Sequence, residues 1–138
     1  MFHKFFPKKL KTPHIKLGIE LLEAIDILRS VDSHIFEESG REDSYHINTA
    51  DFDMAIYPHG NIVKSVWFDD PAGRFLAGGK LKKIQMYLDR YSSLTNWELR
   101  LDNGCMQYWF NDVDKMQMVY GLHKDVIRFN QYPNNDEE

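Results

Sequence analysis

Apolar side chains recur at steps of three and four residues in the first quarter of the chain, which is the spacing of one helix face. This stripe consists of Leu17, Leu21, Ala24, Leu28 and Val31. Thr12 is a suitable N-cap residue, and Pro13 suits the first helical position. The pattern predicts a helix over residues 13–31, with Gly18 as a weak point in its interior.

The middle of the chain predicts a hairpin and a second helix. Residues 37–44 are polar and charged and are expected to form a loop, and two β-favouring runs at 52–57 and 62–68 then flank a turn cluster at 58–61. The second helix is expected after residues 77–79. Its apolar face is assigned to Leu81, Ile84, Leu88 and Tyr91, and Lys80, Lys82, Lys83 and Arg90 are assigned to the remainder of its surface.

The last third of the chain indicates a meander of strands. Trp97, Leu99 and Leu101 alternate with charged residues, the pattern of a half-buried strand. The dipeptide Asn103-Gly104 favours a type I′ hairpin turn, which requires positive φ at both positions. Further strands are expected at 105–110, 115–120 and 125–129.

These elements predict an α+β fold: one antiparallel sheet of five to six strands with two principal helices, in the order α-β-β-α-β-β-β-β. The expected organisation is a basic N-terminal arm (1–12), one domain (13–132) and an acidic polar tail (133–138). The sequence itself shows no internal repeat.

Composition narrows the function classes. The chain has 138 residues and one cysteine, Cys105, which fits a reducing compartment and predicts a cytoplasmic protein; no apolar run is long enough to cross a bilayer. Residues 1–16 carry five lysines and no acid, so with a chain total of −4 the remaining residues carry −9. An acidic body disfavours nucleic acid and favours a basic protein partner. The alternative is that this acidity only maintains solubility.

The stretch Gly73–Leu81, GRFLAGGKL, lacks the pattern of a phosphate-binding loop. Gly78 has the spacing of a Walker A motif, but Gly79 occupies the lysine position and the hydroxyl residue is missing. We therefore expect no nucleotide and no other cofactor.

Acidic and aromatic residues are concentrated between positions 37 and 70. If Tyr57 pairs near Ile62, Asp53 lies opposite Val66 and Asp51 lies opposite Phe68. We interpret the region as a surface that binds a basic protein. The candidate binding residues are Glu37, Glu38, Glu42, Asp43, Tyr45, Asp51, Asp53, Tyr57, Asp69 and Asp70.

Two alternatives remain open at this point. Asp51, Asp53, Asp69 and Asp70 could hold a divalent cation in a small metal-dependent hydrolase or nuclease. The strand at 105–110 carries bulky side chains on both faces, so one face could instead meet a second copy in a homodimer that serves as a sensor or scaffold. Cys105 itself is expected to be half-buried.

The interpretation that we favour is a non-enzymatic protein-binding protein. Its concrete form is a small acidic inhibitor, such as the immunity protein of a bacterial toxin–immunity pair, which covers the active surface of a basic toxin or nuclease domain. Small size, an acidic body, many aromatic residues and the absence of a catalytic motif support it.

Overall fold

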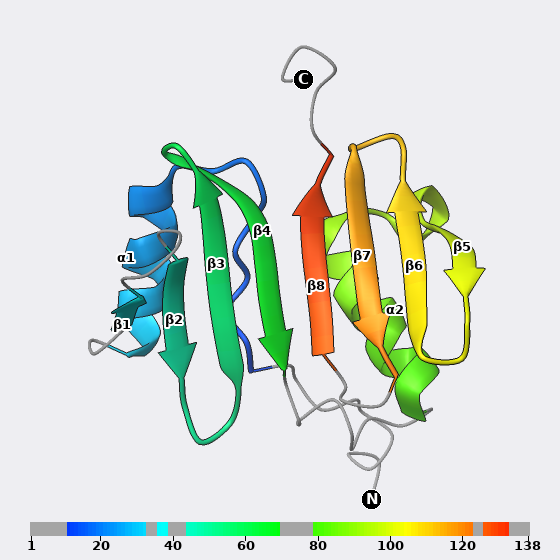
Figure 1. The fold of residues 1–138 in the computed structure, drawn as a ribbon, viewed down its shortest axis with the longest axis horizontal. Helices are drawn as coiled ribbons and strands as arrows, with labels where there is room; N and C mark the ends of the chain where they lie inside the picture. Colours follow the sequence, from blue (N-terminus) through cyan, green and yellow to red (C-terminus); the bar gives the residue numbers. More distant parts are fainter. Residues whose placement is uncertain (1–10, 33–35, 39–43, 70–78, 123–125, 133–138) are drawn as a thin grey trace, which may run out of the picture.

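A single antiparallel sheet with two helices carries the fold (Figure 1). The computed structural model describes residues 11–32, 36–38, 44–69, 79–122 and 126–132. The helices are α1 (Leu21–Val31) and α2 (Gly79–Tyr91), with a short 3-10 helix at Leu94–Asn96. The strands are β1 (Phe36–Glu38), β2 (Ser44–Asn48), β3 (Asp53–His59), β4 (Ile62–Asp69), β5 (Glu98–Asp102), β6 (Met106–Asn111), β7 (Met116–Gly121) and β8 (Val126–Gln131).

The strand order is β1-β2-β3-β4-β8-β7-β6-β5, and every neighbouring pair that is described is antiparallel. The chain thus repeats one pattern twice, a helix followed by four strands, and the two halves meet where β4 pairs with β8. Figure 1 shows the halves side by side, with α1 and α2 both behind the sheet.

The predicted α+β class with an antiparallel sheet is confirmed, but the predicted number of strands is too small. The structure has eight strands rather than five to six, and four of them precede α2. Part of the segment expected to be a loop forms β1 and the start of β2, where Phe36 pairs with His46. These strands were missed because they are short and rich in polar residues, which weakens the alternation that marks a strand.

The first helix begins at Leu21, so the prediction of a helix from Pro13 is wrong. Gly18 has φ +89°, a left-handed conformation that interrupts a helix. Its amide donates to the carbonyl of Val63 at 2.8 Å, and the Leu21 amide donates to the carbonyl of Asn61 at 2.7 Å. The segment before α1 therefore attaches to the beginning of β4 by backbone hydrogen bonds.

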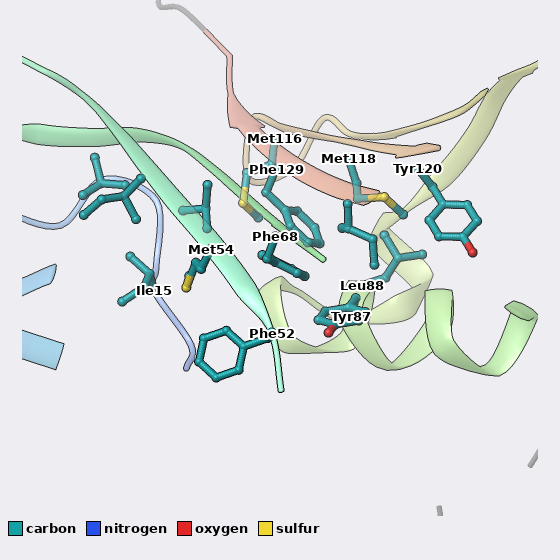
Figure 2. Close-up of a cluster of buried hydrophobic side chains, with 14 of the residues drawn as sticks. Ile15, Phe52, Met54, Phe68, Tyr87, Leu88, Met116, Met118, Tyr120 and Phe129 are labelled. Atoms are coloured by element: carbon teal, nitrogen blue, oxygen red, sulfur yellow. The ribbon is translucent and has the colours of Figure 1, made fainter. Parts of the chain in front are cut away.

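The hydrophobic core lies between the helices and the sheet. Figure 2 shows Tyr87 and Leu88 of α2 facing Phe68, Met118 and Phe129 of the sheet, and all five side chains are buried. The same core continues to Ala24 and Leu28 of α1 and to Ile47, Met54 and Ile56. One core therefore joins both halves of the sheet.

The predicted buried face of α2 is correct at Ile84 and Leu88 and wrong at two positions. Leu81 is 59% exposed, whereas Lys83, which we assigned to the outer surface, is 1% exposed. Lys83 lies one helical turn before the buried Tyr87 and therefore on the same side of the helix.

The strand at the β5 edge is exposed rather than half-buried. All five of its residues are exposed, and Trp97, just before it, turns inward and donates from Nε1 to the carbonyl of Leu88 at 3.1 Å. The register shifts between Leu99 and Leu101, a bulge of the kind that protects edge strands. The expected alternation is also interrupted, because Leu99 pairs with Trp109 and Leu101 pairs with Tyr108, so the two leucines lie on opposite faces of the sheet.

The turn between β5 and β6 is correctly placed, but it is not type I′. Gly104 has φ +83°, whereas Asn103 does not have a positive φ. The Asn103 side-chain oxygen instead accepts hydrogen bonds from the amides of Cys105 at 2.9 Å and Met106 at 2.8 Å. The asparagine side chain thus supplies the acceptor for this turn.

Candidate functional site

We call the sheet surface opposite α1 and α2 the open face, because no described helix covers it (Figure 1). Cross-strand pairing organises its side chains into rows. The central row runs across seven strands and consists of His46, Ala55, Trp67, Arg128, Val119, Tyr108 and Leu101. Trp67, Val119 and Tyr108 are half-buried by their neighbours, so the row presents partly exposed apolar and aromatic surface.

The open face is hollowed over the second half of the sheet. A hollow of about 670 Å³ lies over β4, β8, β7 and β6. Its apolar lining includes Trp67, Met106, Tyr108, Val119 and Val126. A hollow with this lining accepts an apolar side chain or ligand group.

Arg128 is the cation among the described residues that line this hollow. Its guanidinium carbon lies 5.7 Å from the centroid of the Tyr57 ring, a cation–π contact. The side chain is exposed, and no carboxylate of a described residue pairs with it. Arg128 therefore contacts the Tyr57 ring and is the cross-strand neighbour of Trp67.

A row of hydrogen-bonded polar side chains borders one side of the central row. Ser65 Oγ donates to Asn130 Oδ1 at 2.7 Å, and Asn130 Nδ2 donates to Gln117 Oε1 at 3.2 Å. These bonds link β4, β8 and β7 on the open face, and they fix the polar rim of the hollow, to which Asn130 belongs.

Two acidic residues border the other side. Asp53 lies directly opposite Asp69, not opposite Val66 as the sequence indicated. The first pair of the hairpin is His59 and Ile62, and the register then shifts between Tyr57 and Pro58. Both features displace the pairs farther from the turn relative to the register that the sequence indicated. Asp69 in turn pairs with Val126 of the hollow. The register therefore places two carboxylates side by side at this border of the open face.

The other two aspartates of the expected cluster do not join this pair. Asp51 precedes β3 and accepts a hydrogen bond from Lys11 Nζ at 2.9 Å, and Asp70 lies outside the described residues. Within the described ranges, no three or more histidine, cysteine, aspartate or glutamate side chains group closely enough to hold a metal ion.

The remaining candidate binding residues are dispersed. Tyr57 lies on the open face, whereas Tyr45 pairs with the buried Ile56 and packs against the core on the helix-covered side. Glu37 and Glu38 lie on the edge strand β1, and their side chains are not described. Glu42 and Asp43 lie outside the described residues.

Cys105 is exposed, so the expectation of a half-buried cysteine is wrong. It belongs to the turn before β6 and not to the strand, and it lines the hollow beside Met106. Met106, Tyr108 and Phe110 lie on one face of β6, as predicted. Their partners on β7 are Gly121, Val119 and Gln117, which are also spaced two residues apart.

Sequence reasoning missed the contribution of β8 to this site. Val126, Arg128 and Asn130 face the open side, and Ile127 and Phe129 face the core. The alternation that assigns them was visible in the sequence, but the pairing of β8 with β4 was not.

Comparisons with known proteins returned no similarity. No protein-family model, no curated protein and no solved structure matches the chain. In the part of the chain that the structure describes, neither helix is long and apolar enough to cross a membrane.

Proposed function

We propose that this chain is a non-enzymatic protein-binding protein that uses the open face as its interface. The observation that carries the proposal is the hollow around Trp67 and Arg128 with the Asp53–Asp69 pair at its border. In its concrete form the protein is a cytoplasmic immunity or inhibitor protein, which covers the active surface of a basic toxin or nuclease domain.

The size of the open face suits a protein partner. Eight strands span about 33 Å, and strands of five to six residues are about 17 Å long, which gives roughly 600 Å² in projection. This is the same order as the roughly 800 Å² that each partner buries in a standard interface. Tryptophan, tyrosine and arginine are the residues that most often dominate binding energy, and Trp67, Tyr57 and Arg128 adjoin one another here.

Charge supports a basic partner. Residues 17–138 carry −9, and Asp53 on the open face is not paired with a cation of any described residue. A lysine or arginine of the partner can pair with Asp53, and the acidic body increases the rate of encounter.

The test is capture of the partner with matched variants. The tagged chain is incubated with native lysate at low and high salt, and retained proteins are identified by mass spectrometry. We expect one stoichiometric basic protein that binds the wild type, is lost with Trp67→Ala and with Arg128→Ala, and is retained by Leu22→Ala. Leu22 is a suitable control because it is 72% exposed on α1, away from the open face.

The identity of the captured protein decides the concrete form. Inhibition of its toxic or nuclease activity by the wild-type chain, and not by Trp67→Ala, supports the immunity function. A captured protein that binds all four chains equally contradicts the assignment of the interface. If the wild-type chain is a dimer in gel filtration and Trp67→Ala is a monomer, the open face binds a second copy of this chain rather than a different protein.

The metal-dependent enzyme makes a different prediction. A cation that binds the folded chain raises its melting temperature by mass action. We expect Mg²⁺ and Mn²⁺ to leave the melting temperature unchanged in the wild type. A rise that disappears in Asp53→Asn would contradict the non-enzymatic proposal.

A further inference from the structure

A second hollow lies on the helix-covered side of the molecule, between the segment that precedes α1, the end of α2 and the end of β8. Its volume is about 280 Å³. His14, Lys16, Arg90 and Gln131 line it, and we call it the basic hollow. Among the described residues, it shares no lining residue with the hollow on the open face.

Three basic side chains meet there in a chain that is acidic overall. The pKa of His14 is lowered, first by burial and then by the positive charges of Arg90 and Lys16. Arg90 uses Nη1 and Nη2 to donate to the hydroxyl and carbonyl oxygens of Thr12, at 2.9 and 2.7 Å, and both acceptors are neutral. Lys16 pairs with no carboxylate of a described residue. Lys16 and Arg90 therefore disfavour the protonated form of His14, and neither cation forms an ion pair with a described residue.

Two buried polar atoms in the basic hollow point to a polar occupant. His14 Nδ1 and Gln131 Oε1 are inaccessible to solvent, and neither forms a hydrogen bond with a described residue. Buried polar atoms are generally hydrogen-bonded to protein, water or a ligand. The Gln131 amide presents either its oxygen or, after rotation by 180°, its nitrogen to an occupant.

Of the carboxylates in the described part of the chain, that of Asp114 also lines the basic hollow. It is already engaged, because Asp114 Oδ2 accepts hydrogen bonds from Ser92 Oγ and from Asn111 Nδ2. The Tyr91 hydroxyl donates to the carbonyl of Ile15 at 2.9 Å and is likewise occupied. The groups left to bind an occupant are therefore basic or amide groups.

We propose that the basic hollow binds one small oxyanion of the size of phosphate. Lys16 and Arg90 supply the charge, and His14 in its protonated form donates from Nδ1. The anion would connect the segment before α1 to α2 and to β8. This inference is independent of the proposed function, since the basic hollow and the open face lie on different sides of the sheet.

The proposal implies a pH dependence. The charged and titratable groups that face His14 are Lys16 on its own segment, Arg90 and Tyr91 on α2, and Asp114 after β6. A bound oxyanion favours the protonated imidazole, so binding raises the pKa of His14. By linkage, an oxyanion whose own charge is constant over this range, such as sulfate, binds more tightly at pH 6 than at pH 8.

The experiment is a titration with inorganic phosphate, followed by NMR of the histidine imidazoles and by thermal unfolding, with sodium chloride at matched ionic strength as the reference. We expect the His14 signals to shift and to titrate at higher pH as phosphate is added. The melting temperature should rise more with phosphate than with chloride at a fixed pH. With sulfate, whose charge does not change between pH 6 and pH 8, it should rise more at pH 6 than at pH 8.

Matched lysine variants locate the effect. Lys16→Met should weaken phosphate binding by about tenfold, as expected for loss of one charge-assisted contact. Lys82→Met should bind like the wild type, because Lys82 is exposed on α2 and does not line the basic hollow. Equal stabilisation by phosphate and chloride, unmoved His14 signals, or equal weakening by both variants would each overturn the proposal.

Discussion

The ring of Phe129 stacks on the ring of Tyr91, with the centroids 4.0 Å apart and the planes inclined by 26°. This contact joins β8, at the centre of the sheet, to the last turn of α2. Phe129 also lies 6.1 Å from the ring of Phe68 on β4 and 5.9 Å from that of Trp97. One side chain thus touches both halves of the fold.

Phe129→Ala should therefore destabilise the protein strongly. The side chain is completely buried, and removing it leaves a cavity among three aromatic rings. We expect a loss of about 3–5 kcal/mol in the free energy of unfolding, measured by urea denaturation. Leu22→Ala, at a 72% exposed position, should change it by no more than about 0.5 kcal/mol. Equal effects of the two substitutions would show that Phe129 is not part of the core.

Gly18→Ala tests the interruption before α1. Gly18 has φ +89°, and an added Cβ would lie 3.4 Å from Gln131 Nε2. We expect a loss of about 1–2 kcal/mol because a side chain disfavours this backbone conformation. Gly60→Asn is the control, since Gly60 has φ +64° with nothing within 4 Å of the added atom. An increase in stability with Gly18→Ala would instead support the longer helix that the sequence indicates.

The sequence predicted those elements that local pattern and turn chemistry determine. The hairpin of β3 and β4, the helix α2 and the meander from β5 to β8 were placed within a few residues. The errors arose where a single residue overrides a pattern. Gly18 interrupts the predicted helix within an apolar stripe that continues through it, and Lys83 is buried although its type favours the surface.

The candidate site was less predictable, because it depends on pairing between distant strands. Trp67 and Arg128 adjoin only because β4 pairs with β8, and no local signal specifies that pairing. The position of Asp53 opposite Asp69 depends on a register shift at Pro58. Counting residues back from the hairpin turn does not predict this pair. The repeated order of one helix and four strands is likewise a property of the fold, with no repeat in the sequence.

Acid should weaken the contact between Arg100 and Asp112. Hydrogen bonding to Arg100 is the main cause that lowers the pKa of Asp112 below its usual 3.8 in the folded chain. The folded-state pKa is thus below the unfolded-state value, so the stabilisation is present above about pH 4 and is lost as the pH falls through the folded-state pKa. The melting temperature of Asp112→Asn should accordingly decline less steeply below pH 4 than that of the wild type.

Arg100→Gln is the reciprocal variant for this contact. It removes the donor to Asp112, so the melting temperature should again decline less steeply below pH 4 than in the wild type. The double variant should show no further change in this slope. If the melting temperature of Arg100→Gln declines below pH 4 as steeply as that of the wild type, the contact between Arg100 and Asp112 does not contribute to acid sensitivity.

Cys105 provides a reporter for occupation of the open face. It is exposed in the turn before β6 and lines the hollow, so a maleimide reagent should label the native chain at one site without denaturant. A partner seated on the open face excludes the reagent, and we expect labelling to slow in proportion to the bound fraction. A Cys105→Ser chain that carries Leu22→Cys places the thiol on α1 and should be labelled equally with and without the partner. Protection of the α1 thiol and not of Cys105 would show that the partner binds the helix layer, and it would contradict the interface that we assign.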